Sequence, residues 1–212
     1  MIRNVSLEDI SDGKLYELND MVKADCNDCK GCSKCCRGMG DSIVLDPYDI
    51  YELKKGLGNS FEELMKKDIK LSVIDGLILP VINMDVEEKC AFLDINGRCS
   101  IHSFRPGICR LFPLGRYYEK NGFKYFLQTN ECVNTNRTKI KVKKWLGYSD
   151  VIKHEQFVNK WHYFLKNIEE DISKKDADFS KKICIGILNQ FYIKDYTTDF
   201  YMEFDERINQ LL

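Results

Sequence analysis

Five cysteines crowded into eleven residues constrain this chain more than any other feature of its sequence. They are Cys26, Cys29, Cys32, Cys35 and Cys36. Two cysteines separated by two residues can direct both thiolates at one ion, about 2.3 Å away if the ion is zinc, and iron–sulfur sites use the same spacing. The residues between them are mostly polar, which argues against burial of these cysteines as small hydrophobic core residues. The segment therefore predicts a metal site.

Four more cysteines follow in the middle of the chain, each beside a turn or hairpin signal. They are Cys90, Cys99, Cys109 and Cys132. A loop that carries a cysteine near its base can return that thiol to a common centre, so we expect both groups to meet around bound metal. Eight thiolates would fill two tetrahedral sites or bridge one polynuclear cluster. The sequence is consistent with both arrangements.

The adjacent pair Cys35 and Cys36 also has two interpretations. On an extended backbone, neighbouring side chains point to opposite sides. The two sulfurs would then serve different ions, or one would be a ligand and the other a structural or reactive thiol. In a tight turn, both could reach one multinuclear centre.

The start of the chain and its overall charge bear on the compartment and the partners. Residues 1–9 include two acids and no apolar run, so we expect no signal peptide, and no stretch approaches the roughly 20 apolar residues that span a bilayer. We therefore expect a cytoplasmic protein without a membrane partner, whose cysteines are ligands rather than disulfides. A net charge of −1 gives no strong signal for nucleic acid either.

Before residue 70 the sequence predicts a polar lead-in and two helices. Residues 1–25 read as the lead-in, with one or two helical turns. The first helix has Asp46 as its N-cap and Pro47 at its first position, and it can stop at Gly56 or Gly58. The second helix starts at a capping-box pair and turns three apolar residues inward. The capping pair is Ser60 and Glu63. The inward residues are Phe61, Leu64 and Ile69.

Between residues 70 and 130 three turn signals predict a small antiparallel sheet. The turns are Asp75-Gly76, Asn96-Gly97 and Asn121-Gly122. The strand pairs around them would be 71–74 with 77–79, 91–93 with 98–101, and 114–119 with 123–127. Pro80 would lie on an edge or at a strand end, because it lacks an N–H for the ladder.

After about residue 145 the hydrophobic period becomes helical. One face recurs at helical spacing in a helix that starts near Asp150, and its members are Phe157, Trp161, Phe164, Leu165 and Ile168. A second helix would carry Cys184, Ile185, Leu188 and Phe191, and the last dozen residues a third. The predicted fold is α+β: a cysteine-cluster metal-binding domain at 1–135, with short helices and hairpins around the metal, and a helical C-terminal extension at 136–212 packed on it. No internal repeat is evident.

Several other residues need an interpretation. Arg37, Arg105 and Arg110 would lie near the thiolates as hydrogen-bond donors, because eight thiolates on two divalent ions leave a charge of about −4. His102 could be a ligand, although a turn histidine is the better interpretation. Core packing is expected for Cys184 and His154, and exposure for His162. The basic run Arg137, Lys139, Lys141, Lys143 and Lys144 favours a solvated edge strand over an RNA-binding surface.

The order of the motifs resembles the CxxCxxCC family, also called YkgJ cysteine-cluster proteins. The run Cys29-x2-Cys32-x2-Cys35-Cys36 matches the family signature. It is followed by Cys90-Ala91-Phe92-Leu93, Gly97-Arg98-Cys99-Ser100-Ile101-His102, and Arg105-Pro106-Gly107-Ile108-Cys109-Arg110-Leu111-Phe112-Pro113. The resemblance covers about residues 26–132 and implies a zinc- or iron-chelating domain. Cys26 is an addition to the signature.

Three functions are compatible with this resemblance. The first is a metal-binding module that holds zinc or iron, the latter as single ions or as an iron–sulfur cluster. The second is an iron-dependent protein-lysine N-methyltransferase, because some relatives resemble flagellin N-methylases; flagellin would then be the type of protein substrate, and adenosylmethionine the methyl donor. The third is a thiolate protein for metal storage or trafficking. No glycine-rich loop follows a predicted strand, so the residues themselves do not support an adenosylmethionine site.

Overall fold

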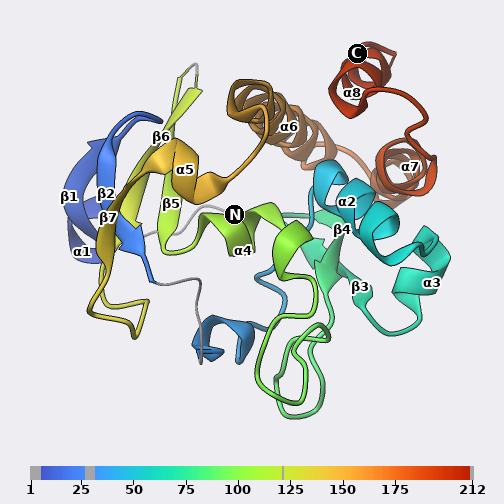
Figure 1. Ribbon diagram of the computed structural model, residues 1–212. Coiled ribbons are helices and arrows are strands. Elements are labelled where there is room, and N and C mark those ends of the chain that lie inside the picture. The colour runs from blue at the N-terminus through green and yellow to red at the C-terminus, as the bar shows by residue number, and fades with distance from the viewer. Residues whose placement is uncertain (1–5, 27–31, 121, 211–212) are drawn as a thin grey trace.

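The computed structural model describes residues 6–26, 32–120 and 122–210. Strands β1, β2, β5, β6 and β7 gather on one side of the molecule, and helices α2, α3, α6, α7 and α8 gather on the other around the β3–β4 hairpin (Figure 1). The loops that carry the cysteines lie between the two sides, at the bottom of this view. The α+β class predicted from the sequence is confirmed.

The N-terminal segment is more structured than the predicted polar lead-in. A single helical turn, α1 (Leu7–Ile10), is followed by two strands, β1 (Ser11–Tyr16) and β2 (Met21–Asp25). In β2 the alternating residues Val22 and Ala24 are buried, as expected for a strand with one face on a core. The segment is therefore part of the sheets.

Two small sheets form the strand side. In the first, β6 (Gly122–Gln128) lies between β1 and β5 (Leu114–Glu119), and all neighbours are antiparallel. This confirms the third predicted hairpin, although Asn121 lies outside the described residues. In the second, β2 pairs with β7 (Thr138–Lys141), and the chain continues into α5 (Val142–Leu146). The basic run is thus divided between an edge strand and the short helix.

The two helices predicted before residue 70 are present with the predicted caps. Helix α2 (Pro47–Leu57) ends at Gly58, whose positive φ of 69° suits glycine, and α3 (Phe61–Met65) is a shorter helix. Both begin with capping boxes, formed by Asp46 with Asp49 and by Ser60 with Glu63. Ile69 is buried as predicted, but it lies on the following strand and not on α3.

The first predicted hairpin is confirmed and is slightly longer than expected. Strands β3 (Ile69–Ile74) and β4 (Leu77–Ile82) pair in register around Asp75 and Gly76, which both have positive φ, as a type I′ turn requires. Pro80 lies opposite Leu71 within β4. The sheet has two strands, so both are edges and the missing N–H is tolerated.

The C-terminal third is helical, as predicted. Helix α6 (Val151–Ile172) starts after Asp150, and α7 (Ala177–Ile187) runs directly into a π-helical turn, η4 (Leu188–Ile193). The last helix is α8 (Phe200–Asn209). Of the residues expected on the second of these helices, Cys184 is buried and Ile185 is exposed, because a helix turns adjacent residues to different faces. No helix in the described part of the chain is long and apolar enough to cross a bilayer.

Two hydrophobic cores meet at α4 (Gly107–Leu111), the short helix that carries Cys109. Leu111 is buried in the core of the strand side, which also contains Val22, Ala24, Leu114, Tyr125, Leu127, Val142 and Leu146. Cys109 packs against the other core, built from α2, α3, β3, β4 and the C-terminal helices. The position of this cysteine therefore depends on both sides of the molecule.

The second predicted hairpin is wrong. Residues 91–93 and 98–101 form no strands, and a single bridge joins Leu93 to Cys99. The Asp94 side chain accepts hydrogen bonds from the backbone of Asn96 and Arg98. Two backbone hydrogen bonds, from the amide of Asp94 to the carbonyl of Arg98 and from the amide of Ser100 to the carbonyl of Phe92, also close this loop. This cysteine-bearing region is thus built from loops and from two 3-10 turns, η2 (Lys34–Cys36) and η3 (His102–Phe104).

The close approach of α2 to η3 depends on Gly56. A Cβ at this position would lie 2.6 Å from the ring of Phe104. We expect Gly56→Ala to lower the free energy of unfolding by about 1–3 kcal/mol, because the ring must move within a packed region. Chemical denaturation measures this loss. Gly186→Ala is the matched control, since it lies in α7 where an added Cβ meets nothing within 4 Å, and it should be neutral or stabilising.

Candidate metal centre

Four thiols from two separate stretches of the chain line one small cavity. Cys26, Cys32 and Cys35 belong to the first cysteine run, and Cys132 follows β6. The cavity has a volume of about 30 Å³, enough for a single ion or water molecule. Its other lining residues are Lys34, Phe112, Pro113, Glu131, Val133 and Asn134. Glu131, a carboxylate at this cavity, was missed by the sequence analysis, in which nothing distinguishes it from other acidic residues.

A second group of thiols surrounds Cys109. Burial raises the pKa of the Cys109 thiol well above its ordinary value, and nearby charges on Cys90, Asp49, Cys99 and Cys35 raise it further. Burial also raises the pKa values of Cys90 and Cys99; Cys99 and Cys35 add to the rise at Cys90, and Cys35 adds to the rise at Cys99. Thiols that oppose each other's ionisation in this way are close together. A cation among them would favour their deprotonated form.

Cys35 belongs to both groups. Its side chain lines the small cavity and also hydrogen-bonds to Cys36, which is the main reason for its raised pKa. Burial adds to this rise, whereas the positive charge of Arg105 opposes it. The backbone of Cys36 in turn accepts a hydrogen bond of 2.9 Å from the amide of Cys90. The first cysteine run, at η2, thus contacts the loop that carries Cys90.

Two consecutive loops present Cys90 and Cys99 in the same way. In the first, the Asp85 side chain accepts hydrogen bonds of 2.8 and 2.9 Å from the backbone two and four residues later. In the second, Asp94 accepts equivalent bonds of 2.9 and 2.8 Å. The cysteine follows directly in both loops, and its sulfur accepts a hydrogen bond from the amide two residues on, at Phe92 or Ile101. Each sulfur therefore has a donor that stabilises a thiolate.

The two loops are a short duplication that the sequence analysis missed. Asp85-Val86-Glu87-Glu88-Lys89-Cys90 aligns with Asp94-Ile95-Asn96-Gly97-Arg98-Cys99, and the fourth residue of each has a positive φ. The apolar residues at the tips, Val86 and Ile95, are fully exposed. The recurring aspartate, β-branched residue and cation before cysteine were the signal that could have revealed the repeat.

The three arginines predicted near the thiolates occupy different positions. Burial and neighbouring thiols raise the pKa of both Cys35 and Cys99, and the positive charge of Arg105 partly offsets this rise; Arg105 also contacts the ring of His102. Arg110 instead donates to the carbonyls of Ser103 and Leu146. Arg37, on the surface, donates to Ser33. The predicted hydrogen-bonding roles at sulfur stay predictions for all three.

The described cysteines are all free thiols, and Cys29 lies outside the described residues. Within residues 6–26, 32–120 and 122–210, no three His, Cys, Asp or Glu side chains are arranged closely enough to hold one ion. The described thiols therefore form two neighbouring groups, and in neither group are three of them close enough to coordinate one ion. The groups come from the two stretches of sequence that we expected to meet.

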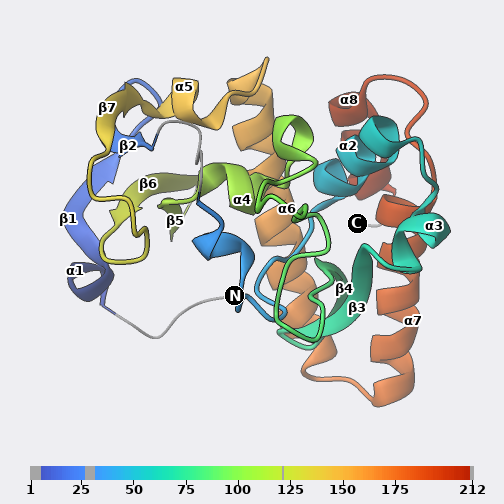
Figure 2. The same ribbon diagram turned by 60° about the horizontal axis from the view of Figure 1, so that its bottom comes forward.

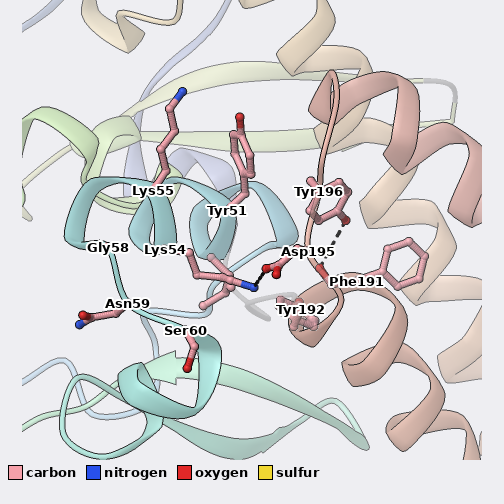
Figure 3. Close-up of a pocket in the computed structure, with 11 residues that line it drawn as sticks. Tyr51, Lys54, Lys55, Gly58, Asn59, Ser60, Phe191, Tyr192, Asp195 and Tyr196 are labelled. Atoms are coloured by element: carbon pink, nitrogen blue, oxygen red, sulfur yellow. Dashed lines mark hydrogen bonds and ion pairs between the residues drawn. The ribbon is translucent and has the colours of Figure 1, made fainter.

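A larger cavity, of about 520 Å³, lies away from the cysteines, between α2 and the segment that follows η4 (Figure 3). Lys54 points across it to an ion pair with Asp195 and donates to the carbonyl of Ile193. Its described lining residues include no cysteine, histidine or glutamate. This cavity is therefore separate from the thiol groups.

Cys184 and His154 are core residues, as predicted. The Cys184 sulfur accepts a hydrogen bond of 3.4 Å from the amide of Ile78. The His154 ring is buried and stacks on Tyr148, with ring centres 3.5 Å apart. His162 was predicted to be exposed, but it is half-buried because its ring stacks on Tyr118.

His154 should make the fold sensitive to acid. Burial lowers the pKa of His154 to about 2, with smaller contributions from Arg116 and Arg110. In the unfolded chain this histidine binds a proton below about pH 6.5, so the unfolded state binds more protons and stability falls as the pH falls. We expect about 2 kcal/mol of this loss between pH 7 and pH 5. His154→Phe should remove it, as measured by denaturation in a chelator; parallel pH curves for both proteins would contradict the assignment.

Comparison with known proteins supplies the family. A family model named CxxCxxCC and described as a "putative zinc- or iron-chelating domain" matches residues 28–163, which is more than half of the chain. No curated protein and no solved structure matches the chain. The matched span includes η2, the duplicated loops, α4 and Cys132, and thus every segment of the two thiol groups except the one that carries Cys26. The chain therefore belongs to the CxxCxxCC family.

Proposed function

We propose that this protein binds zinc or iron at two neighbouring thiolate centres. The first centre would use Cys26, Cys32 and Cys132 around the small cavity, together with Cys29. The second would use Cys36, Cys90, Cys99 and Cys109. Cys35 lies between them and could bridge the two. The single observation that carries the proposal is that four thiols from two distant stretches of the chain line one cavity of about 30 Å³.

The donor set fits such ions. Thiolates are soft ligands that suit zinc and iron–sulfur clusters. The amides of Phe92 and Ile101 and the guanidinium of Arg105 favour negative charge on the sulfurs. Burial without a cation has the opposite effect and keeps the thiols protonated. A bound ion would therefore be accompanied by proton release, which makes its affinity pH-dependent. The reduced thiols that it needs are consistent with a cytoplasmic location.

The bound metal would supply either structural cross-linking, as zinc does, or electron transfer and Lewis acidity, as iron does. The chain's own residues provide the thiolates, orient Cys90 and Cys99 through the duplicated loops, and compensate charge through Arg105. Methyl transfer from adenosylmethionine to a protein such as flagellin, and metal storage, stay predictions from the family resemblance and the thiol content. No contact in the described residues favours either of them.

Elemental analysis and an absorption spectrum of protein purified without oxygen test the proposal. We expect more than one equivalent of zinc or iron per chain, with thiolate-to-metal absorption if the metal is iron. A closed zinc site would be colourless and would unfold locally when the ion is stripped. Recovery of metal-free protein from cells grown with both metals, with all cysteines reduced and no uptake on titration, would overturn the proposal.

A further inference from the structure

One buried side chain joins a helix without cysteines to the helix that carries Cys109. The Asp49 carboxyl in α2 accepts a hydrogen bond of 2.7 Å from the amide of Gly107, 58 residues further along the chain. Gly107 is the first residue of α4, two residues before Cys109. The other Asp49 oxygen accepts 3.0 Å from the amide of Asp46 in the capping box. Both carboxyl oxygens of Asp49 therefore accept a hydrogen bond, one from the cap of its own helix and one from the start of α4.

The surroundings of this hydrogen bond are closely packed. A Cβ at Gly107 would lie 3.1 Å from the Tyr148 hydroxyl, 3.5 Å from the Asp49 carboxyl and 3.9 Å from the Asp46 carboxyl. Tyr148 is itself held by two contacts. The His154 ring stacks on it, and the Arg110 guanidinium lies 5.0 Å from its ring centre. Three oxygens thus converge on the first residue of α4. The start of this helix has little freedom to shift or turn.

A buried carboxyl is costly to maintain. Asp49 is only 4% exposed, and burial raises its pKa well above the ordinary value, with Asp46 adding to the rise. A helix cap alone does not need this burial, because Ser60 and Glu63 form the same kind of box at the surface of α3. The feature that distinguishes Asp49 from Glu63 is the bond to Gly107. The burial of Asp49 is thus explained by its hydrogen bond to the Gly107 amide rather than by its role in the helix cap.

We propose that Asp49 is a positioning residue of the metal centre, which holds the start of α4 so that the Cys109 thiolate meets those of Cys90 and Cys99. This inference rests on the proposed metal-binding function. Side chains that orient ligands without touching the ion typically change metal affinity by about ten- to hundredfold. Asp49 reaches Cys109 through only two residues of backbone, and α4 lies where the two cores meet.

Cobalt(II) titration of the full chain, reduced and free of oxygen, tests the proposal, because thiolate-bound cobalt has visible absorption that reports its coordination geometry. Asp49→Ala should weaken cobalt binding about ten- to hundredfold and alter the visible bands of the centre that contains Cys109. Asp49→Asn keeps one oxygen for the Gly107 amide, so it should restore most of the affinity and the native bands. Far-UV circular dichroism establishes that each variant is folded.

Ser60→Ala is the matched control, since it removes the cap of α3 without touching α4. It should lower stability as Asp49→Ala does, yet leave cobalt affinity and bands unchanged. Equal affinity and identical bands for Asp49→Ala and the unmodified chain would overturn the positioning role, as would equal losses in Asp49→Ala and Ser60→Ala. Failure of the unmodified chain to bind cobalt would instead overturn the proposed function.

Discussion

Replacing Cys35 by serine is expected to weaken metal binding at both thiol groups at once. Cys35 lines the cavity with Cys26, Cys32 and Cys132, and it also interacts with the group around Cys109. Serine is nearly the same size, but its hydroxyl stays protonated at neutral pH and is a poor ligand for soft ions. The substitution thus removes the one thiol, among the described cysteines, that both groups share.

The expected size of this loss follows from the energy of thiolate sites. Structural zinc sites contribute about 10–16 kcal/mol through four ligands, so one ligand accounts for about 3 kcal/mol, or roughly two orders of magnitude in affinity. We expect Cys35→Ser to lose about this much at each centre. Cys132→Ser should affect only the first centre, and Cys109→Ser only the second, because each belongs to a single group.

Competition with a chromophoric chelator measures these affinities, and metal analysis after gel filtration gives the stoichiometry. Cys184→Ala is the matched control, since this thiol is in the helical core and binds the amide of Ile78. It should retain all metal. A different result would contradict the division into two groups. If Cys35→Ser, Cys132→Ser and Cys109→Ser each lost the same equivalent of bound metal, the thiols would form a single centre.

Phe204→Ala is expected to produce the largest loss of stability among single substitutions in the helical core. Phe204 has no exposed surface, and its ring lies 4.6 Å from Phe157 in an edge-to-face contact, with Phe191 and Trp161 also adjacent. Truncation removes this buried ring and leaves a cavity that rigid aromatic neighbours cannot fill. The free energy of unfolding should fall by about 3–5 kcal/mol.

Urea denaturation of the metal-loaded protein measures this change. Met202→Ala is the control on the same helix, because Met202 is 64% exposed and its loss should cost less than about 0.5 kcal/mol. Metal affinity should be unchanged in Phe204→Ala at low denaturant, since the Phe204 ring packs on aromatic rings of α6 and η4. A loss below about 1 kcal/mol would show that the aromatic cluster is loosely packed.

The sequence predicted well those elements whose signals are local. The N-cap Asp46 and the capping pair of Ser60 with Glu63 each lie at the first turn of their own helix, and the Asp75-Gly76 turn sets its hairpin by backbone geometry alone. The long amphipathic face of α6 is similarly a property of one segment. Strand β1 was missed because it exposes most of its residues and shows no hydrophobic alternation, and β2 because its alternation is limited to two buried residues, Val22 and Ala24.

Predicting the site required information that spans the whole chain. The density of cysteines was enough to predict metal, and the family match agrees with that prediction. The division of the thiols into two groups depends on how β2, β6 and η2 are brought together, and no local pattern contains that arrangement. Figure 2 shows η2 beside the loops that carry Cys90 and Cys99. The sequence indicated Asp46 as the helix cap but gave no sign of the bond from Asp49 to Gly107, 58 residues away.

The duplicated loops have a practical consequence for studying this protein. Each loop closes on its own aspartate before it delivers its cysteine, so Val86 and Ile95 at the tips are not needed to shape the turn. Both side chains extend fully into solvent within a few residues of a thiol. A spectroscopic label attached at either tip would therefore lie four residues from a cysteine of the proposed centre, and could report a bound paramagnetic ion without displacing any ligand.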